Sequence, residues 1–423
     1  MYWLLESEFQ LSWLRSSGYK EAYIDIVPTD NQKHPVENNI SVLYIRPLLA
    51  SKGFMIPINH TEGFNVKKKD VIEILQKFET LFTTDRKSIS HYLFLSNFYD
   101  FLLPPESENF DLTIAHKIFY KKYPTQLNLN RIVPIVKHYE YCENKYESIK
   151  DKIQKHNTKY GEFYNEKVSM VYHNIERNAI GIDTDKFFKH FYNRKEPRVY
   201  PQYNLNTVTT RPSNRFGGVN YAALNKKTGE RSSFIPKNDY FVEFDVVAYH
   251  PVIVSHIIGY EFESEDVHQD FANMYGTSRD KAKEITFQQF YGQIFAKYKD
   301  LRYFRLLLDK QDELKGLYEK DGYIEEPISG YRFKKSKLGD IPKEKLFNYF
   351  LQCTESSINV TILAEIQKIL DKRFTQIVLT VYDSFLLDVK SGEENLLQEI
   401  QNVFKNKKFK TSIKSGYNYD FTS

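Results

Sequence analysis

Arginine, lysine and two aromatic residues recur at every fourth position between residues 279 and 291, and this spacing constrains the chain more than any other feature. The run SRDKAKEITFQQFYGQIF has no proline, and no glycine before Gly292, so it predicts a helix. Because four residues advance a helix by slightly more than one turn, side chains at this spacing share one face. They are Arg279, Lys283, Phe287 and Tyr291. The stripe covers about 18 Å of helix, with the cations before the rings.

This stripe matches the layout of a nucleoside triphosphate. A polyphosphate would lie against the two cations while a base stacks on the rings. The structural alternative is a helix with a solvated basic end and a buried aromatic end. The helix by itself does not decide between these two interpretations.

Other segments of the chain bear on that choice. R-xxx-K-xxx-F-xxx-YG resembles the finger-helix motif of family A DNA polymerases, which include DNA polymerase I and phage replicative enzymes. DVHQDFANMYG, with Asp266 and His268, resembles the Asp-x-His segment that precedes this helix. IERNAIGID (175–183) resembles the start of the family's polymerase domain, and the tail IKSGYNYDFTS resembles its C-terminus. The resemblance implies that the stripe and His268 bind the incoming dNTP, and that Lys283 protonates the pyrophosphate leaving group.

Composition is compatible with this resemblance without requiring it. The 423 residues suffice for two or three domains, and 41% hydrophobic and 27% charged residues are ordinary values for a globular protein. The net charge of +4 permits nucleic-acid binding. The two cysteines, Cys142 and Cys353, have no metal-binding spacing. The sequence has no membrane-spanning run, and we expect a cytoplasmic protein of a bacterial or phage-infected cell.

Two aspartates are candidate metal ligands. Asp245 in YFVEFDVVAYH and Asp383 in QIVLTVYDSFLLDV each end or interrupt an apolar strand. Phosphoryl transfer uses two Mg²⁺ ions held by carboxylates, with Mn²⁺ as an alternative. A purely structural role, in a turn at the end of a strand, accounts easily for one aspartate of this kind. It accounts less easily for two. The family resemblance implies that Asp245 and Asp383 are the catalytic metal ligands.

Several positions depart from the family pattern. Tyr382 and Ser384 replace the histidine and glutamate that flank the second aspartate. His250 replaces the glutamate that screens against a ribose 2′-hydroxyl, so the sugar selectivity stays open. Thr210 replaces a glycine, and Glu344 reverses the charge of an arginine.

Further matches imply contacts with primer-template DNA. TVTTRPSN, with Arg211, resembles a segment that contacts the primer terminus, and Tyr382 lies at a primer-positioning site. Asn348 and Gln352 match an Asn-xxx-Gln pair whose amides contact minor-groove base edges. The family inserts a helical thumb between IGIDTDKF and RVYPQYNLN, where this chain has only a couple of dozen residues. We therefore expect a reduced or absent thumb, and low processivity or a clamp-like partner.

The N-terminal part resembles the family's 3′–5′ exonuclease domain. Asp25, Asp100 and Glu143 occupy positions of its metal ligands. Val27, however, stands where a glutamate ligand belongs, so we expect an inactive site. Strand-like alternation over 20–60, followed by a helix over 66–82, predicts an α/β layer here.

The expected architecture is an α/β and α+β multidomain protein. It has an RNase H-like exonuclease domain at 1–150 and a right-hand polymerase domain at 151–423. The palm is expected at 163–262 and 322–423, with the fingers at 263–321. Two alternatives to a DNA polymerase stay open. One is a single-subunit RNA polymerase, because Asp383-Ser384-Phe385 resembles a motif of those enzymes. The other is a catalytically inactive DNA-binding scaffold.

Overall fold

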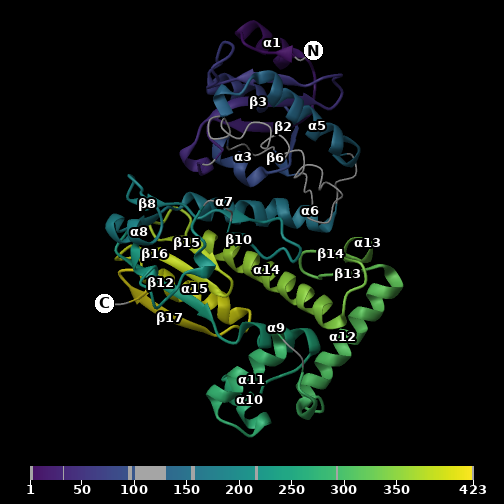
Figure 1. Ribbon diagram of the computed structural model, residues 1–423, viewed down its shortest axis with the longest axis vertical. Coiled ribbons are helices and arrows are strands. Elements are labelled where there is room, and N and C mark those ends of the chain that lie inside the picture. The colour runs from purple at the N-terminus through teal and green to yellow at the C-terminus, as the bar shows by residue number, and fades with distance from the viewer. Residues whose placement is uncertain are drawn as a thin grey trace. The chain divides into compact units, whose positions relative to one another are not determined.

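The computed structural model describes most of the chain and divides it into two compact units, Met1–Arg177 and Asn178–Ser423 (Figure 1). The described residues are 3–31, 33–93, 98–100, 130–153, 158–214, 218–291 and 294–421. For residues 98–100, 130, 152 and 291 the description covers the backbone alone. No described helix combines the length and the apolar character that crossing a bilayer requires.

The first unit is built on a mixed sheet of six strands in the order β1-β4-β3-β2-β5-β6. The strands are β1 (Trp3–Leu4), β2 (Glu21–Pro28), β3 (Ile40–Pro47), β4 (Phe54–Pro57), β5 (Thr80–Thr83) and β6 (Phe98–Asp100). The helices are α1 (Glu8–Ser16), α2 (Lys68–Leu75), α3 (Arg86–Tyr92), α5 (Ile135–Ile153), α6 (Lys159–Phe163) and α7 (Ser169–Arg177).

Both faces of this sheet are covered by helices. Alternation along β2 places Ile24 in a core shared with α1 and α2, and Tyr23 in a second core shared with α5. The predicted α/β layer is therefore present. The predicted helix at 66–82 is wrong at its C-terminal end, because residues 80–83 form β5. That strand pairs in parallel with β2, and its ladder satisfies backbone groups that a helix would have bonded internally.

The compact units divide after Arg177, whereas the sequence placed the domain boundary at 150/151. The last helix of the first unit, α7, packs against α3. Its Glu176 carboxylate lies 2.5 Å from the Lys87 ammonium and is fully buried. A buried ion pair of this kind ties α7 to the first unit, because separating it would leave a charge without a partner.

The second unit centres on an antiparallel sheet in the order β15-β16-β12-β17. The strands are β12 (Tyr240–Val246), β15 (Gln376–Val381), β16 (Ser384–Val389) and β17 (Thr411–Gly416). Smaller sheets comprise β7 (Ile180–Ile182), β8 (Arg198–Val199), β9 (Tyr203–Asn204), β10 (Ser213–Asn214), β11 (Phe234–Ile235), β13 (Tyr323–Glu325) and β14 (Arg332–Lys334). The helices are α8 (Thr184–His190), α9 (Tyr249–Ile258), α10 (Val267–Tyr275), α11 (Arg279–Tyr291), α12 (Arg302–Asp321), α13 (Lys335–Leu338), α14 (Lys343–Ile369) and α15 (Asn395–Asn406).

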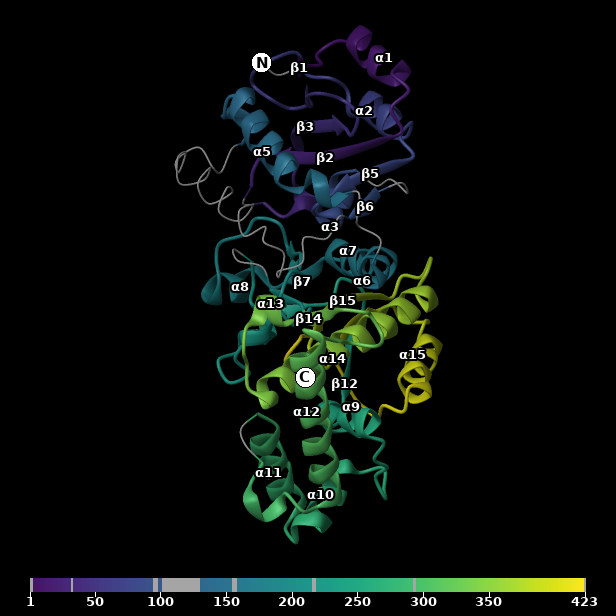
Figure 2. The ribbon, with the colours of Figure 1, turned by 90° about the vertical axis from the view of Figure 1, so that its right-hand side faces the viewer.

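The helices α9 to α14 come between β12 and β15 in the chain. Figure 2 shows α10 and α11 side by side, and α14 runs beside the sheet that carries β12. The strands predicted around Asp245 and Asp383 and the helix predicted for the 279–291 stripe are all present. Residues 183–200 contain one helix, α8, followed by an irregular connection to β8.

Candidate active site

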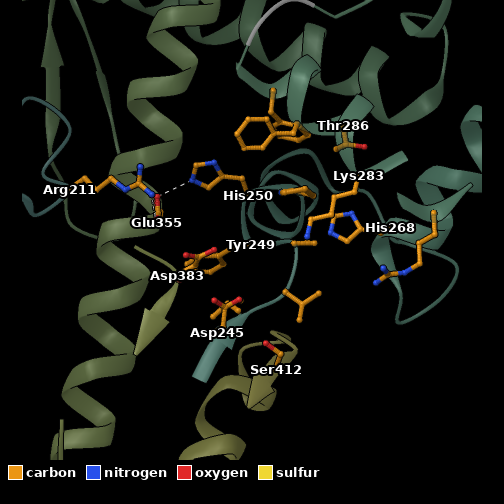
Figure 3. A pocket seen from close by; sticks show the side chains of 17 residues that line it. Arg211, Asp245, Tyr249, His250, His268, Lys283, Thr286, Glu355, Asp383 and Ser412 are labelled. Atoms are coloured by element: carbon orange, nitrogen blue, oxygen red, sulfur yellow. Dashed lines mark hydrogen bonds and ion pairs between the residues drawn. The ribbon is translucent and has the colours of Figure 1, made fainter. Parts of the chain in front are cut away.

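Asp245 lies on β12, and Asp383 lies in the turn that leads into the neighbouring strand β16. Asp245 is paired with Ser384 across the β12–β16 ladder, and the Val246 amide donates to the Asp383 carbonyl at 3.0 Å. Both aspartates line one cavity of about 400 Å³, and Figure 3 shows their carboxylates together at one side of it. Antiparallel pairing thus brings together two residues that lie far apart in the sequence.

The turn between β15 and β16 contains only Tyr382 and Asp383. Val381 pairs with Ser384, and Tyr382 adopts φ +58°, in the left-handed region. Two-residue hairpin turns of this type favour glycine, and a non-glycine residue is strained there. The Asn359 side chain of α14 donates to the Tyr382 carbonyl at 2.9 Å and so holds the turn in place.

The site carries negative charge that the protein neutralises only in part. Burial and the neighbouring Asp245 charge raise the pKa of Asp383 to about 6. Burial, and then the Glu243 charge, raise the pKa of Asp245 as well. A divalent cation would relieve this repulsion, and two carboxylates leave room for the water molecules that Mg²⁺ retains. The pair therefore fits such an ion, although no cluster of three His, Cys, Asp or Glu residues suited to a metal occurs in the described part of the chain.

Helices α10 and α11 supply cationic and aromatic residues to the same cavity. The predicted residues Arg279, Lys283, Phe287 and His268 all line it, and Thr286 joins them. Burial, and then the charges of Lys283 and Arg279, lower the pKa of His268. The predicted Tyr291 is the last residue of α11, and its side chain lies outside the described atoms.

Arg279 and Phe287 keep part of their side chains accessible. The Arg279 Nε donates to Asp266 at 2.8 Å, yet 45% of the side chain is exposed. The ring of Phe287 is 65% exposed, which is unusual for a large apolar side chain. The cations and this ring are thus available to a ligand that enters the cavity.

The structure adds Glu355, which the sequence analysis missed. This α14 residue is 1% exposed and lines the cavity. One carboxylate oxygen accepts from the Arg211 guanidinium at 3.0 Å, and the other lies 2.9 Å from the His250 Nε2 (Figure 3). The only signal in the sequence is a carboxylate within the otherwise uncharged run LQCTESSINV, on the helix of Asn348 and Gln352.

Arg211 and Tyr382 also contact each other. The Arg211 guanidinium lies 3.8 Å from the centroid of the Tyr382 ring, a cation–π distance. Asn348 and Gln352 lie earlier on α14, half-buried, and they do not line this cavity. Of the predicted DNA-binding residues, Arg211 therefore lines the cavity and Tyr382 contacts Arg211, whereas Asn348 and Gln352 lie apart from the cavity on α14.

The buried carboxylate of Glu243 lies beside Ser384. Ser384 donates to Glu243 at 2.8 Å, and the Lys414 ammonium lies 3.3 Å from the other oxygen of Glu243. Glu243 stands two residues before Asp245 on β12 and is 3% exposed. No motif in the sequence predicts this contact, because it joins residues of three strands, β12, β16 and β17.

In the first unit, two predicted exonuclease ligands are bound to side chains of their own unit. The Lys145 ammonium lies 2.5 Å from Asp25, and both side chains are mostly buried. Glu143 accepts from the Tyr44 hydroxyl at 2.6 Å and lies 3.6 Å from Arg46. Of Asp100 the structure gives the backbone, on β6, and its side chain lies outside the description.

Comparison with known proteins identifies a fold. No protein-family model matches the sequence, and no curated protein matches it. Among solved structures, the chain is similar to the POL domain of Pol1 from M. smegmatis, determined in complex with DNA primer-template and dNTP. The TM-score is 0.71 at 13% sequence identity, over 99% of each chain. At this identity the match establishes the architecture, so the chain has the mixed α/β multidomain fold of a polymerase domain.

Proposed function

We propose that this protein is a template-directed DNA polymerase that adds dNTPs to a primer 3′-hydroxyl. The observation that carries the proposal is the meeting of Asp245 and Asp383 in one cavity with Lys283 and Arg279. A carboxylate pair opposite two cations suits a metal-bound triphosphate, because each partner neutralises the other. The solved DNA and dNTP complex of similar fold supports this choice of substrate.

Each residue of the cavity has its own role in the proposed reaction. Asp245 and Asp383 would hold two Mg²⁺ ions, which activate the primer hydroxyl and stabilise the pyrophosphate. Arg279 and Lys283 bind the triphosphate, and Lys283 donates a proton to the leaving group. Phe287, together with Tyr291, stacks on the incoming nucleotide and the template base.

The sugar that the site accepts depends on His250. Its contact with Glu355 fixes the ring at the cavity wall. A histidine here leaves open the alternative of an RNA polymerase, which Asp383-Ser384-Phe385 also suggests. Extension of one primed template with either dNTPs or rNTPs decides between these two enzymes.

The proposal also includes low processivity and an inactive 3′–5′ exonuclease site. The single helix α8 within residues 183–200 supports the absence of a thumb, and so low processivity or a clamp-like partner. The ion pair between Asp25 and Lys145 supports an inactive exonuclease site, because an ammonium already neutralises the carboxylate that a metal would need.

The test of the proposed function is primer extension with Mg²⁺. The wild type should extend a primer in template order, and Asp383→Asn should abolish extension while leaving primer-template affinity within about twofold. Asp371→Asn, an exposed substitution on the same unit, serves as the control. Extension that Asp383→Asn leaves intact would contradict the assignment. A wild type that binds DNA but never extends a primer would favour a scaffold.

A further inference from the structure

Asp266 connects the two helices α10 and α11 beside the cavity. Its Oδ1 accepts hydrogen bonds from the amides of His268 and Gln269, at 3.1 and 3.2 Å, and so caps α10. Its Oδ2 accepts from the Nε of Arg279, the first residue of α11, at 2.8 Å. One side chain, which does not itself line the cavity, therefore fixes two residues that do, His268 and Arg279.

Asp266 is held in place by the turn that precedes α10. Its amide donates to the Ser264 hydroxyl at 3.2 Å. Ser264 in turn donates to Asp270 twice, from its hydroxyl at 2.6 Å and from its amide at 3.0 Å. Asp270 is buried within α10. Because the turn is anchored to a buried side chain, the Asp266 carboxylate has a fixed position from which to orient Arg279.

The contact with Asp266 uses only one edge of the Arg279 guanidinium. A guanidinium carries five N–H donors in a rigid planar fork, and the contact takes the one on Nε. A second carboxylate, Asp280, lies 4.0 Å from Nη1, which is beyond hydrogen-bond distance. Among the described residues, none forms a hydrogen bond with the two Nη atoms, so they remain available to an anion in the cavity.

Asp266 affects an incoming anion in two opposite ways. An unrestrained arginine loses rotamer entropy when it binds an anion, and a carboxylate that already holds the guanidinium reduces this loss. The same carboxylate repels the anion, but its side chain is 41% exposed, and solvent screens the repulsion. We therefore expect the positioning effect to exceed the repulsion.

We propose that Asp266 is a positioning residue for nucleoside triphosphate binding. It holds the Arg279 guanidinium by Nε so that the two Nη groups contact the phosphates, and its cap on α10 fixes His268 on the same cavity. This inference rests on the proposed function for the identity of the ligand, a nucleoside triphosphate.

Equilibrium binding of dATP with Mg²⁺ to the full chain, without primer or template, tests the proposal. The variant is Asp266→Ser, because serine caps a helix as well as aspartate does but is too short to reach Arg279. We expect it to weaken dATP binding about tenfold, the value of one charge-assisted hydrogen bond. Asp280→Ser is the matched control, since it makes the same change at a 98% exposed carboxylate near the same guanidinium. It should change the affinity less than twofold.

A second measurement separates positioning from a general structural effect. If Asp266 acts through Arg279, Asp266→Ser should leave dATP affinity within about twofold when it is introduced into an Arg279→Ala chain. An equal loss in both backgrounds would overturn the proposal. So would an Asp266→Ser variant that binds dATP as tightly as the wild type or more tightly, or a wild type that binds no dATP at about 10 mM.

Primer extension is a separate readout. A chain that shows these binding effects but never extends a primer would refute the proposed function and support the role of Asp266.

Discussion

At the scale of single residues, Glu355 joins parts of the site that the sequence treats separately. It contacts Arg211, before the central sheet, and His250, after β12. A glutamine at 355 keeps the shape but offers one acceptor oxygen, so its NH₂ group would face one of the two partners. We expect Glu355→Gln to lower kcat/KM for dNTP roughly 10- to 100-fold, the value of one charge-assisted hydrogen bond.

Steady-state primer extension measures this effect. Glu344→Gln on the same helix is the matched control, because Glu344 is exposed and should change kcat/KM less than twofold. Equal kinetics for both variants would show that the Glu355 contacts do not support the reaction.

Asp383 provides a second prediction at this scale. Its folded-state pKa, about 6, exceeds the ordinary value of 3.8, so the native state binds its proton more tightly than the unfolded state. Ionisation at neutral pH therefore costs stability, and the cost disappears as the pH falls through this window. We expect Asp383→Asn to raise the free energy of unfolding at pH 8 without metal by up to about 3 kcal/mol, less whatever solvent screening removes.

Denaturant unfolding at pH 8 and at about pH 4 tests whether Asp383→Asn raises the free energy of unfolding as expected. The gain should be largest at pH 8 and nearly absent at pH 4, and Asp371→Asn should show no gain at either pH. A variant that is less stable than the wild type at pH 8 would contradict the electrostatic interpretation.

At the scale of elements, helix α11 separates residues by face. Lys283 lines the cavity, whereas Lys281 lies on another face and pairs with Glu284 at 2.8 Å. If Lys283 donates the proton, Lys283→Ala should lower kcat about 10²- to 10⁴-fold, a typical contribution of general acid catalysis. Lys281→Ala should remain within twofold, and single-turnover extension at saturating dNTP compares the two. Similar losses in both variants would argue against a role specific to the cavity face.

The elements also show how far sequence reasoning reaches. Spacing predicts α11, and the apolar runs around Asp245 and Asp383 predict strands, because both patterns are local. The strand at 80–83 is missed, since only pairing with β2 distinguishes it from the end of α2. The contacts of Glu355 and Lys145 are missed for a similar reason. A charged residue in a helical pattern does not reveal which distant side chain it meets.

At the scale of the whole molecule, the first unit has cores of its own, and two of its candidate nuclease residues, Asp25 and Glu143, form ion pairs with cations. We expect purified protein with Mg²⁺ to leave a 5′-labelled primer at full length when dNTPs are absent. Denaturing gels would detect shortening. Degradation that Asp25→Ala stops would show that the exonuclease site is active despite Lys145.

The length of DNA made in one binding event depends on how much duplex the molecule holds. Each phosphate neutralised on a duplex adds about 0.9 to the salt slope of binding, so an enzyme with few upstream contacts dissociates early. Residues 183–200, where the sequence analysis expects a reduced or absent thumb, contain the seven-residue helix α8. With a heparin trap, we expect products of a few nucleotides, shortening further as salt rises.

Addition of cell extract should lengthen these products if a clamp-like partner supplies the missing contacts. Long products at high salt from the purified chain alone would mean that the second unit grips the duplex by itself.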